Sequence, residues 1–557
     1  MAATASNNSA GNLQQRQSAN YDPSVWGDFF VTYVRDNKNV RVWLEEAEML
    51  KEKVQKMLKH EDDFTIEHLS EKLSIIDAVE RLGIAYHFET EIQDMLRRVF
   101  EHFKDENNHQ HYELVTLALL FRLLRQHGYN VSSGIFNKFR GNKDGFKDFV
   151  AEDVEGMLCL YEATHLRLRG ELILDKALAF TKNTLELKLP SLRPSLAARV
   201  SHTLRWPVQK CLTRVGARKY ISIYQEIELH NEVLLKFAKL DFNLLQLQHQ
   251  EELCIITKWW KELDVKNKLP YARDRITECY FWILGVYYEP QYALARKFAV
   301  KVIALASVLD DTYDVYGTYE ELERLTQAFE RWDIHVMDEL PEYMKTIYQA
   351  VLEIYSEMEE EMAKRGRSFA ICYAKEAMKR LVKAYLDEAK WLVEKKVPTM
   401  EEYLRVALPS TAYPMLSMVS LVGMEEVATK DVFLWLLSEP PLQHSICCIC
   451  RFMDDIVSRE LEKKREHIPS AVDCYMKEYK VTASEACEVL SIEVENAWKD
   501  INQAFLDPKA PSMPVLMRIL NLVRVIELLY TGEDMYTHSR KMKPLVDSLL
   551  LIPLQII

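Results

Sequence analysis

Apolar residues recur three and four positions apart through most of this chain, the spacing that keeps side chains on one face of an α-helix. The pattern is clear over residues 69–82, 112–127 and 234–252. It predicts further helices over residues 277–288, 320–331, 341–365, 368–395, 399–422, 430–437, 442–463, 469–478, 483–505 and 513–531. We find no convincing strand, so the pattern predicts an all-α protein.

Polar stretches divide these helices into two sets. Residues 133–148, with three Gly and several Lys, are expected to form a loop, and residues 189–194, with two Pro, break the next helices apart. A second helical set begins near residue 230, and 557 residues suffice for more than one domain. We expect a disordered segment over residues 1–20, an N-terminal helical domain over 21–230 and a C-terminal helical domain over 231–557.

Composition and charge narrow the possible partners. Nearly half of the residues are hydrophobic (48%), with only 15 Gly and 18 Pro, which favours long helices over a turn-rich β-protein. A net charge of −13 argues against nucleic acid or an anionic membrane surface as a partner. An anionic substrate would therefore need a few Arg residues and metal ions for local attraction.

The chain carries no sign of export. Its ten Cys show no framework spacing, which indicates a reducing compartment. The first twenty residues lack the apolar core of a secretory signal and the Arg content of a transit peptide, and no apolar run reaches transmembrane length. We expect a soluble cytosolic protein.

An apolar run over residues 300–309 ends in three carboxylates, Asp310, Asp311 and Asp314. The run favours a buried helix that ends at Gly317, on which Asp310 and Asp314 share one face. Carboxylates at a buried helix end repel each other unless a cation is present, and all-oxygen ligation favours Mg²⁺. Alternatively, the motif is an ordinary solvated helix end.

A second acidic series consists of Asp454, Ser458 and Glu462. At a spacing of four residues, their side chains form one stripe along a helix and could coordinate one hard cation. Taken alone this signal is weak, because many solvated helix faces have such spacings. Together, the two acidic helices predict opposed metal sites across a helical bundle, with room for a diphosphate between them.

Arginines and aromatic residues accompany the acidic helices. Arg273 and Arg275 flank one Asp, and Arg451 precedes Asp454 by one helical turn. Guanidinium groups bind phosphate oxygens bidentately, although surface salt bridges are equally compatible with the Arg273 pair. The aromatic residues Trp282, Tyr313, Tyr413, Tyr530 and Tyr536 could form a dry cavity that stabilises carbocations, or could simply pack in the core.

These motifs jointly resemble those of the plant terpene synthases, specifically the cytosolic sesquiterpene synthases. D-D-T-Y-D at 310–314 is similar to the family's D-D-x-x-D, and D-D-I-V-S-R-E-L-E at 454–462 to its second metal motif. R-D-R at 273–275 is similar to the family's R-x-R. Arg16-Gln17 with Trp26 resembles its N-terminal R-P-x8-W, with Gln in place of Pro.

The resemblance implies a relic α-barrel as the N-terminal domain, in which we find no D-x-D-D motif, and a class I synthase bundle as the C-terminal catalytic domain. It implies three Mg²⁺ ions, with Mn²⁺ as a possible substitute. The implied metal ligands are Asp310, Asp314, Asp454, Ser458 and Glu462, with Asp311 in an auxiliary role.

The resemblance also assigns the remaining site. Arg273, Arg275 and Arg451 would bind diphosphate, and Asp310, Asp314, Arg273 and Arg451 would carry catalysis. The implied substrate pocket comprises Trp282, Thr411, Tyr530, Asp534 and Tyr536, and the implied N-terminal cap comprises Arg16 and Trp26.

The implied reaction is the Mg²⁺-dependent ionisation and cyclisation of farnesyl diphosphate by a monomeric enzyme that needs no nucleic acid and no stable membrane contact. Three alternatives stay open at this point: a monoterpene synthase that uses geranyl diphosphate, a chain-elongating prenyltransferase, and a non-catalytic helical scaffold. The absence of a transit peptide argues against the first, and the second acidic motif, which is not D-D-x-x-D, argues against the second.

Overall fold

A computed structural model of the chain describes residues 21–33, 39–59, 65–104, 111–141, 145–462 and 467–556, with the backbone alone at 66–67 and 460–462. The segment 1–20, which was expected to be disordered, lies outside the described residues. Every regular element within them is helical, and the one β-type pairing is an isolated bridge between Arg140 and Phe146. The predicted all-α class is confirmed.

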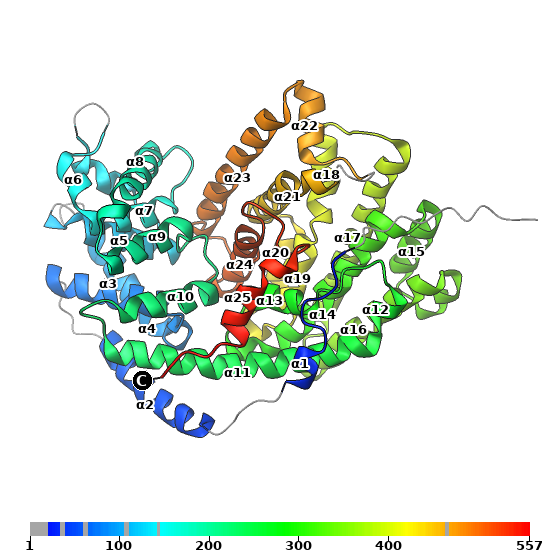
Figure 1. Cartoon of the computed structure of the whole chain (residues 1–557), viewed down its shortest axis with the longest axis horizontal. Coiled ribbons are helices and arrows are strands. Elements are labelled where there is room, and N and C mark those ends of the chain that lie inside the picture. The colour runs from blue at the N-terminus through cyan, green and yellow to red at the C-terminus, as the bar shows by residue number, and fades with distance from the viewer. Residues whose placement is uncertain are drawn as a thin grey trace, which may run out of the picture.

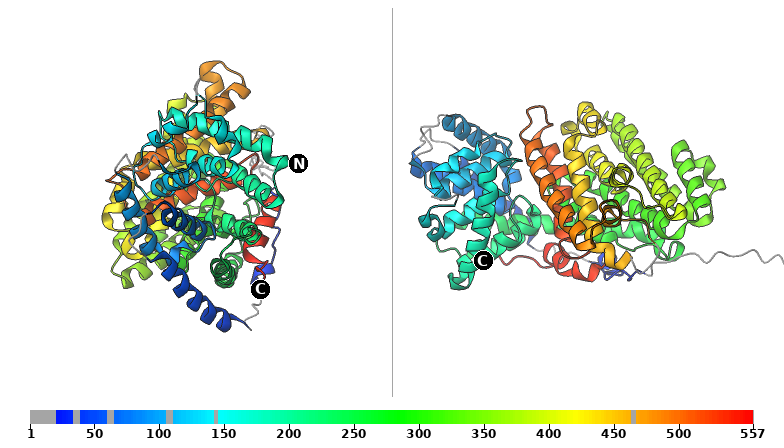
Figure 2. Two further views of the ribbon diagram at one scale, coloured as in Figure 1. Left: turned by 90° about the vertical axis from the view of Figure 1, so that its left-hand side faces the viewer. Right: turned by 90° about the horizontal axis from the view of Figure 1, so that it is seen from above.

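The helices fall into two bodies (Figures 1 and 2). The first contains α2 (Val40–Leu58), α3 (Ile66–Arg81), α4 (Glu89–Phe103), α5 (Leu114–Gln126), α6 (Asp148–Glu152), α7 (Val154–Thr164), α8 (Leu172–Lys188), α9 (Pro194–Arg205) and α10 (Thr213–Gln225). The loop expected over 133–148 contains a short 3₁₀ helix, Ser133–Phe139, which Ser132 begins by accepting a hydrogen bond from the backbone N–H of Gly134.

The second body contains α12 (Val265–Lys268), α13 (Ile276–Val286), α14 (Ala293–Asp311), α15 (Tyr319–Arg331), α16 (Glu342–Lys364), α17 (Phe369–Glu394), α18 (Met400–Ser410), α19 (Tyr413–Val422), α20 (Lys430–Leu437), α21 (Pro441–Glu462), α22 (Ala471–Tyr479), α23 (Ala483–Phe505), α24 (Met513–Leu529) and α25 (Lys543–Leu550). Capping boxes begin α15, α18, α22 and α23, where a Thr or Ser and the acidic residue three positions later exchange hydrogen bonds.

One long helix, α11 (Glu232–Leu263), runs beneath both bodies (Figure 1). Its 32 residues span about 48 Å at 1.5 Å per residue. The C-terminal residues 549–554 return along it, because Asn243 and Gln246 donate side-chain hydrogen bonds to the carbonyl oxygens of Leu554 (2.8 Å) and Leu549 (2.9 Å). The predicted division near residue 230 coincides with the start of this helix, which itself contacts both bodies.

The described N-terminal residues do not join the N-terminal body. Residues 21–33, which include α1 (Phe29–Thr32), lie against the C-terminal body, where Asp28 pairs with Lys261 of α11 (2.6 Å). Trp26 is buried there and donates a hydrogen bond to Glu278 of α13. The expected start of the N-terminal domain at residue 21 stays a prediction, although residues 21–33 pack on the other body. Trp26 and Phe30 are the buried apolar side chains of this segment, and α1 packs against α11.

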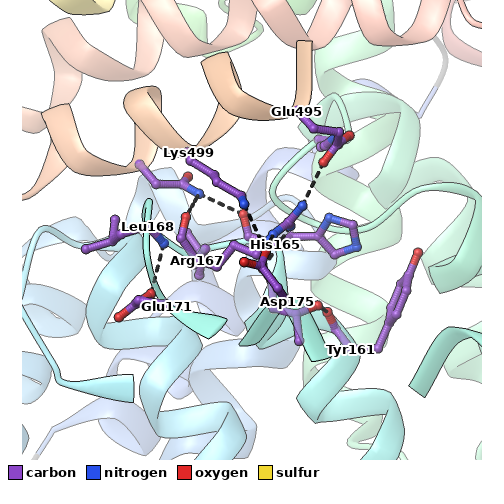
Figure 3. A network of polar contacts seen from close by, with 12 residues as sticks. Tyr161, His165, Arg167, Leu168, Glu171, Asp175, Glu495 and Lys499 are labelled. Atoms are coloured by element: carbon purple, nitrogen blue, oxygen red, sulfur yellow. Dashed lines mark hydrogen bonds and ion pairs between the residues drawn. The ribbon is translucent and has the colours of Figure 1, made fainter. Parts of the chain in front are cut away.

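A polar network joins the two bodies where α23 meets the loop after α7 (Figure 3). Arg167 donates to Glu495 (2.9 Å), and Lys499 pairs with Asp175 (2.9 Å). The Asn502 amide donates to the carbonyl oxygen of Arg167 (3.0 Å), so α23 is held by both side-chain and backbone groups.

None of the helices in the described part of the chain combines the length and apolar character needed to cross a membrane.

Candidate active site

A cavity of about 480 Å³ opens in the C-terminal body. It lies among α13, α14, α17, α18, α19, α21, α24 and the loop that follows α24. The structure places most of the predicted site residues on its wall, although they are far apart in the sequence: Arg273, Trp282, Asp310, Asp314, Thr411, Arg451, Asp454, Ser458, Tyr530, Asp534 and Tyr536.

The first acidic wall is the C-terminal end of α14. The sequence predicted a regular helix up to Gly317. In the structure the α-helix ends at Asp311, and the chain continues as one π-helical turn, Thr312–Tyr316. Thr312 supports this turn by donating its hydroxyl to the Val308 carbonyl (2.7 Å). Asp310 and Asp314 line the cavity, whereas Asp311 is buried behind it with 1% exposure.

Arg273 joins the two neighbouring aspartates. Its Nη2 lies 2.6 Å from Asp310 Oδ2 and its Nε 3.0 Å from Asp311 Oδ1, while its backbone N–H donates to Asp311 Oδ2 (2.8 Å). The guanidinium also lies 5.1 Å from the ring centre of Tyr21 and 5.3 Å from that of Tyr536, within cation–π range. Asp311 therefore orients the arginine, and Asp310 is the carboxylate that faces the cavity.

The second acidic wall, on α21, repeats this arrangement. Arg451 donates through Nη2 to Asp454 and through Nε to Asp455 (2.7 Å). Asp455 is buried and also accepts from the Tyr403 hydroxyl (2.6 Å) and the Ala471 backbone N–H (2.6 Å). Sequence reasoning missed Asp455, although the Asp-Asp doublet that it forms with Asp454 matches the doublet at 310–311 and could have predicted its role.

Ser458 lies one turn further along α21 and lines the same cavity. Its hydroxyl oxygen is buried and lacks a hydrogen-bond partner, a costly state that a ligand would relieve. Glu462 is the last residue of α21, and its side chain lies outside the described residues. Its predicted metal contact therefore stays a prediction.

Arg275 differs from its predicted role. It is buried (1% exposed), is not part of the cavity wall, and donates to the carbonyl oxygens of Tyr536 (3.2 Å) and Thr537 (3.0 Å). Because the guanidinium is used on the backbone of the loop after α24, it positions that loop and does not face a substrate. Asp534 also supports the loop, since its Oδ1 accepts from the N–H groups of Tyr536 and Thr537 (both 2.9 Å).

Aromatic side chains cover the inner part of the cavity. The ring of Trp282 packs edge-to-face against Tyr536 (centres 5.5 Å apart) and Tyr530 (6.4 Å). The Tyr536 hydroxyl donates to Ser307 Oγ (2.8 Å), and that of Tyr413 donates to the Leu522 carbonyl (2.8 Å). With their hydroxyl groups engaged, Tyr413 and Tyr536 present apolar ring faces to the cavity.

The predicted helix over 399–422 is broken beside the cavity. α18 ends at Ser410, and Ala412 adopts a left-handed conformation (φ +63°) before α19 begins at Tyr413. Pro409 and Pro414 flank this break and remove two backbone donors that a continuous helix would use. The break brings Thr411 and Ala412 to the cavity wall.

Three further residues at the cavity, Glu388, Tyr21 and Asp22, belong to none of the motifs recognised in the sequence. Glu388 of α17 is buried and accepts from the Ser410 hydroxyl (2.5 Å), and its burial raises its pKa to about 8. Tyr21 and Asp22 also line the cavity, and nearby Trp26 anchors the N-terminal segment through its burial and its hydrogen bond to Glu278. The predicted cap residue Arg16 lies outside the described residues, and Trp26 serves as the anchor without lining the cavity.

The oxygen atoms on the cavity wall suit a hard cation whose remaining coordination positions would be filled by phosphate oxygens. Within the described residues, no three or more His, Cys, Asp or Glu side chains gather into a metal-binding group. Mg²⁺ in phosphate sites takes only one or two carboxylates and fills its remaining positions with phosphate oxygens and water. Asp310 with Asp314, and Asp454 with the unpartnered hydroxyl of Ser458, are partial oxygen sets of this kind.

An all-helical fold with two aspartate-rich walls around an aromatic cavity is the arrangement expected of a metal-dependent enzyme that releases diphosphate. Residues 25–204 match the family description "Terpene synthase, N-terminal domain", and residues 261–500 match "Terpene synthase family, metal binding domain". The chain belongs to the terpene synthase family, as its motifs predicted.

Named relatives narrow the class. The chain is 51% identical over 543 residues to (-)-germacrene D synthase of Vitis vinifera, covering 97% of this chain and 96% of the relative. It is 50% identical to sesquiterpene synthase 2 of Toona sinensis, with 97% of each chain covered. The structure is also similar to that of isoprene synthase from grey poplar leaves in complex with three Mg²⁺ ions and a thiolodiphosphate. The two structures superpose with a TM-score of 0.86 and share 31% sequence identity, and the match covers 93% of this chain and 99% of that chain.

Proposed function

We propose that this protein is a sesquiterpene synthase that ionises and cyclises farnesyl diphosphate and releases diphosphate. The observation that carries the proposal is the convergence of two arginine-bridged aspartate pairs on one aromatic cavity. The high identity to relatives that are named sesquiterpene synthases supports the C15 substrate over geranyl diphosphate. The monomeric state and the cytosolic location stay predictions.

The two arginines have partners that would change on substrate binding. Arg273 and Arg451 neutralise Asp310 and Asp454 in this structure. With the aspartates held by metal ions, both guanidiniums would be able to donate to the oxygens of the diphosphate instead. Asp311 and Asp455 stay bonded to the arginines and keep them aimed at the cavity. The negative charge that develops on the leaving diphosphate is thereby stabilised by groups already in place.

We propose Mg²⁺ at the two walls, three ions in all, with Mn²⁺ as a possible substitute. Asp310 and Asp314 would hold the metal on one side, and Asp454, Ser458 and Glu462 on the other. The bound ions would supply Lewis-acid charge to the departing diphosphate. The three Mg²⁺ ions in the grey poplar isoprene synthase complex support this number.

The remaining residues would control the carbocation. Trp282, Tyr530 and Tyr536 offer aromatic faces that stabilise positive charge without acting as nucleophiles. Tyr21 and Asp22, carried by the N-terminal segment, lie at the cavity and would help to exclude water. Deprotonation or capture of a single water would end the reaction.

The proposal is tested by replacing one cavity-facing aspartate on each wall. Asp310→Asn and Asp454→Asn each preserve side-chain size but remove the charge that a cation needs. We expect turnover of farnesyl diphosphate with Mg²⁺ to fall at least about 100-fold in each variant, as measured by gas chromatography of the products and by diphosphate release. Full turnover in either variant would contradict the role of that wall.

Substrate choice needs a separate experiment. The wild-type enzyme is assayed with geranyl, farnesyl and geranylgeranyl diphosphate under the same conditions, and kcat/KM is compared. We expect farnesyl diphosphate to be preferred. A higher kcat/KM with geranyl diphosphate would assign the enzyme to monoterpene synthesis, and absence of Mg²⁺-dependent diphosphate release from all three would favour the scaffold alternative.

A further inference from the structure

A second cavity, of about 220 Å³, lies between the two helical bodies and shares no wall residue with the first. α3, α4, α9 and α10 contribute to one side of it, and α24 with the segment that follows α13 forms the other. The exposed residues Glu89 and Gln93 mark its mouth. Its volume equals about seven water molecules in the liquid, which is room for a small organic molecule.

Arg524 of α24 reaches this cavity as a buried cation (3% exposed). Its Nε donates to the Gln209 carbonyl (2.9 Å), its Nη1 to Asn521 Oδ1 (3.0 Å) and its Nη2 to the Val208 carbonyl (3.3 Å). A guanidinium carries five N–H groups, so two remain after these three bonds. All three acceptors are neutral, and burial lowers the pKa of Arg524 to about 10, so it still carries its charge at neutral pH.

The other charged groups of the inner cavity wall have partners of opposite charge. Arg518 binds Glu289 with two hydrogen bonds (2.8 and 3.1 Å), and Arg81 pairs with Asp77 (2.7 Å). Glu80 lies 2.7 Å from His127 Nε2 and pairs with Arg122 (3.6 Å). Among the described residues, no carboxylate lies within ion-pair distance of Arg524. A buried charge in this state is costly, and an anionic ligand would offset the cost.

Part of the wall suits a hydrocarbon. Trp206, Leu212, Met513 and Met517 line the cavity, and methionine side chains adapt readily to irregular apolar ligands. We propose that the inter-domain cavity binds a small amphipathic monocarboxylate, with the carboxylate on the two remaining N–H groups of Arg524 and the hydrocarbon body against these side chains. This site is separate from the catalytic cavity, and the inference does not depend on the proposed reaction.

The charge balance selects a monoanion over other ligands. The nearby carboxylate Glu80 offsets part of the charge of Arg524 without pairing with it, so a diphosphate carries more negative charge than this guanidinium can neutralise, and a cationic ligand would meet Arg524 directly. The carboxylate of Glu89 lies at the exposed mouth, where water screens it, so it weakens the attraction without blocking entry.

Octanoate is a suitable probe, titrated into the full-length enzyme by calorimetry beside octanol and octylamine. We expect octanoate to bind at least about tenfold more tightly than either, because only the carboxylate satisfies a charged donor pair. Arg524→Gln should weaken octanoate binding by a similar factor. Equal affinity for octanol, or unchanged octanoate binding in Arg524→Gln, would overturn the proposal.

Arg214→Gln is the matched control. Arg214 is also buried, burial also lowers its pKa to about 10, and it donates to the Phe242 carbonyl, but it does not line the cavity. This variant should bind octanoate as the wild type does, and a loss equal to that of Arg524→Gln would count against the site.

Glu89→Gln, at the exposed mouth, tests the proposal without touching the core. Its affinity for octanoate should rise about twofold. An unchanged or lower affinity there would contradict it.

Discussion

At the scale of single residues, the buried carboxyl of Glu278 combines a structural contact with a titration. Its side chain has no exposed surface, its Oε1 accepts from the Trp26 indole (3.3 Å), and its Oε2 has no hydrogen-bond partner. Burial raises its pKa from the ordinary 4.5 to about 7, against the opposing effects of its own helix backbone and of Arg275. The folded enzyme therefore keeps a proton on Glu278 over a pH range in which the unfolded chain has lost it.

The sign of the resulting pH dependence follows from that difference. Between about pH 4.5 and 7 only the folded state binds the proton, so stability falls as the pH rises through this range. Glu278→Gln keeps the acceptor oxygen but cannot ionise. We expect it to exceed the wild type by less than about 1 kcal/mol at pH 5 and by up to about 3 kcal/mol at pH 8, measured by chemical denaturation at both pH values. An equal difference at pH 5 and pH 8 would refute the titration of this group.

Sequence reasoning placed Asp310 and Asp454 on the metal-binding walls and gave Asp311 an auxiliary role, but it assigned no role to Asp455. Helical spacing shows which side chains share a face, so Asp310 and Asp314 were predictable as neighbours. Whether a guanidinium faces the cavity or the backbone depends on tertiary contacts, which is why Arg273 and Arg275, two positions apart, took different roles. Glu388 was not predictable, because its place at the cavity depends on how α17 packs.

At the scale of elements, the predicted helices exist, but the irregular turns between them build the site. The periodic pattern predicted α14 and α18–α19 and could not show the π-helical turn after Asp311 or the left-handed residue Ala412. Both deviations bring polar groups to the cavity wall, Asp314 in one case and Thr411 in the other. Local periodicity reports the average helix, whereas such turns are held by contacts with other elements, such as the Tyr271 hydroxyl near Thr312 Oγ1 (2.9 Å).

The N-terminal segment is the element with the clearest testable role. Trp26→Phe retains the ring beneath Lys543 (4.6 Å) but removes the hydrogen bond to Glu278. Residues 21–22 should then be held less firmly at the cavity, so water should reach the carbocation more often. We expect a higher proportion of alcohol products and a several-fold lower kcat/KM, because a hydrogen bond to a buried carboxyl contributes about 1–2 kcal/mol.

Trp498→Phe provides the matched control for this prediction. It removes the same kind of bond, from the Trp498 indole to Glu527 Oε1 (2.6 Å), at the contact between α23 and α24 outside the catalytic cavity. Its product profile, determined by gas chromatography, should equal that of the wild type. Identical shifts in both variants would show that general destabilisation, and not loosening of the N-terminal segment, changes the products.

At the scale of the whole molecule, the two helical bodies are joined by charge as well as by apolar packing. Glu495 on α23 accepts from Lys210 (2.6 Å) and Arg167 (2.9 Å), both of which belong to the N-terminal part (Figure 3 shows Arg167 and Glu495). Burial acts to raise the pKa of Glu495, but the two cations outweigh it and lower the pKa to about 2. The contact therefore depends on a carboxylate that stays ionised in moderate acid.

Glu495→Gln measures what this contact contributes. With a folded pKa of about 2 and an ordinary value of 4.5, the ionised carboxylate stabilises the fold above pH 4.5, and this contribution is lost as the pH falls towards 2. Because the Glu495 side chain is 43% exposed, water screens the pairs, and the loss at pH 7 should be about 1 kcal/mol or less. In the variant, Lys210 still pairs with Glu527 (3.3 Å) and Arg167 with Asp175 (2.9 Å), so neither cation is left unpaired.

The experiment measures the free energy of unfolding by chemical denaturation from pH 7 to pH 3. The difference between Glu495→Gln and the wild type should narrow below pH 4.5. The control Glu493→Gln, an exposed change on the same helix, should match the wild type throughout. A difference that stays constant down to pH 3 would show that the ionised contact does not hold the two bodies together.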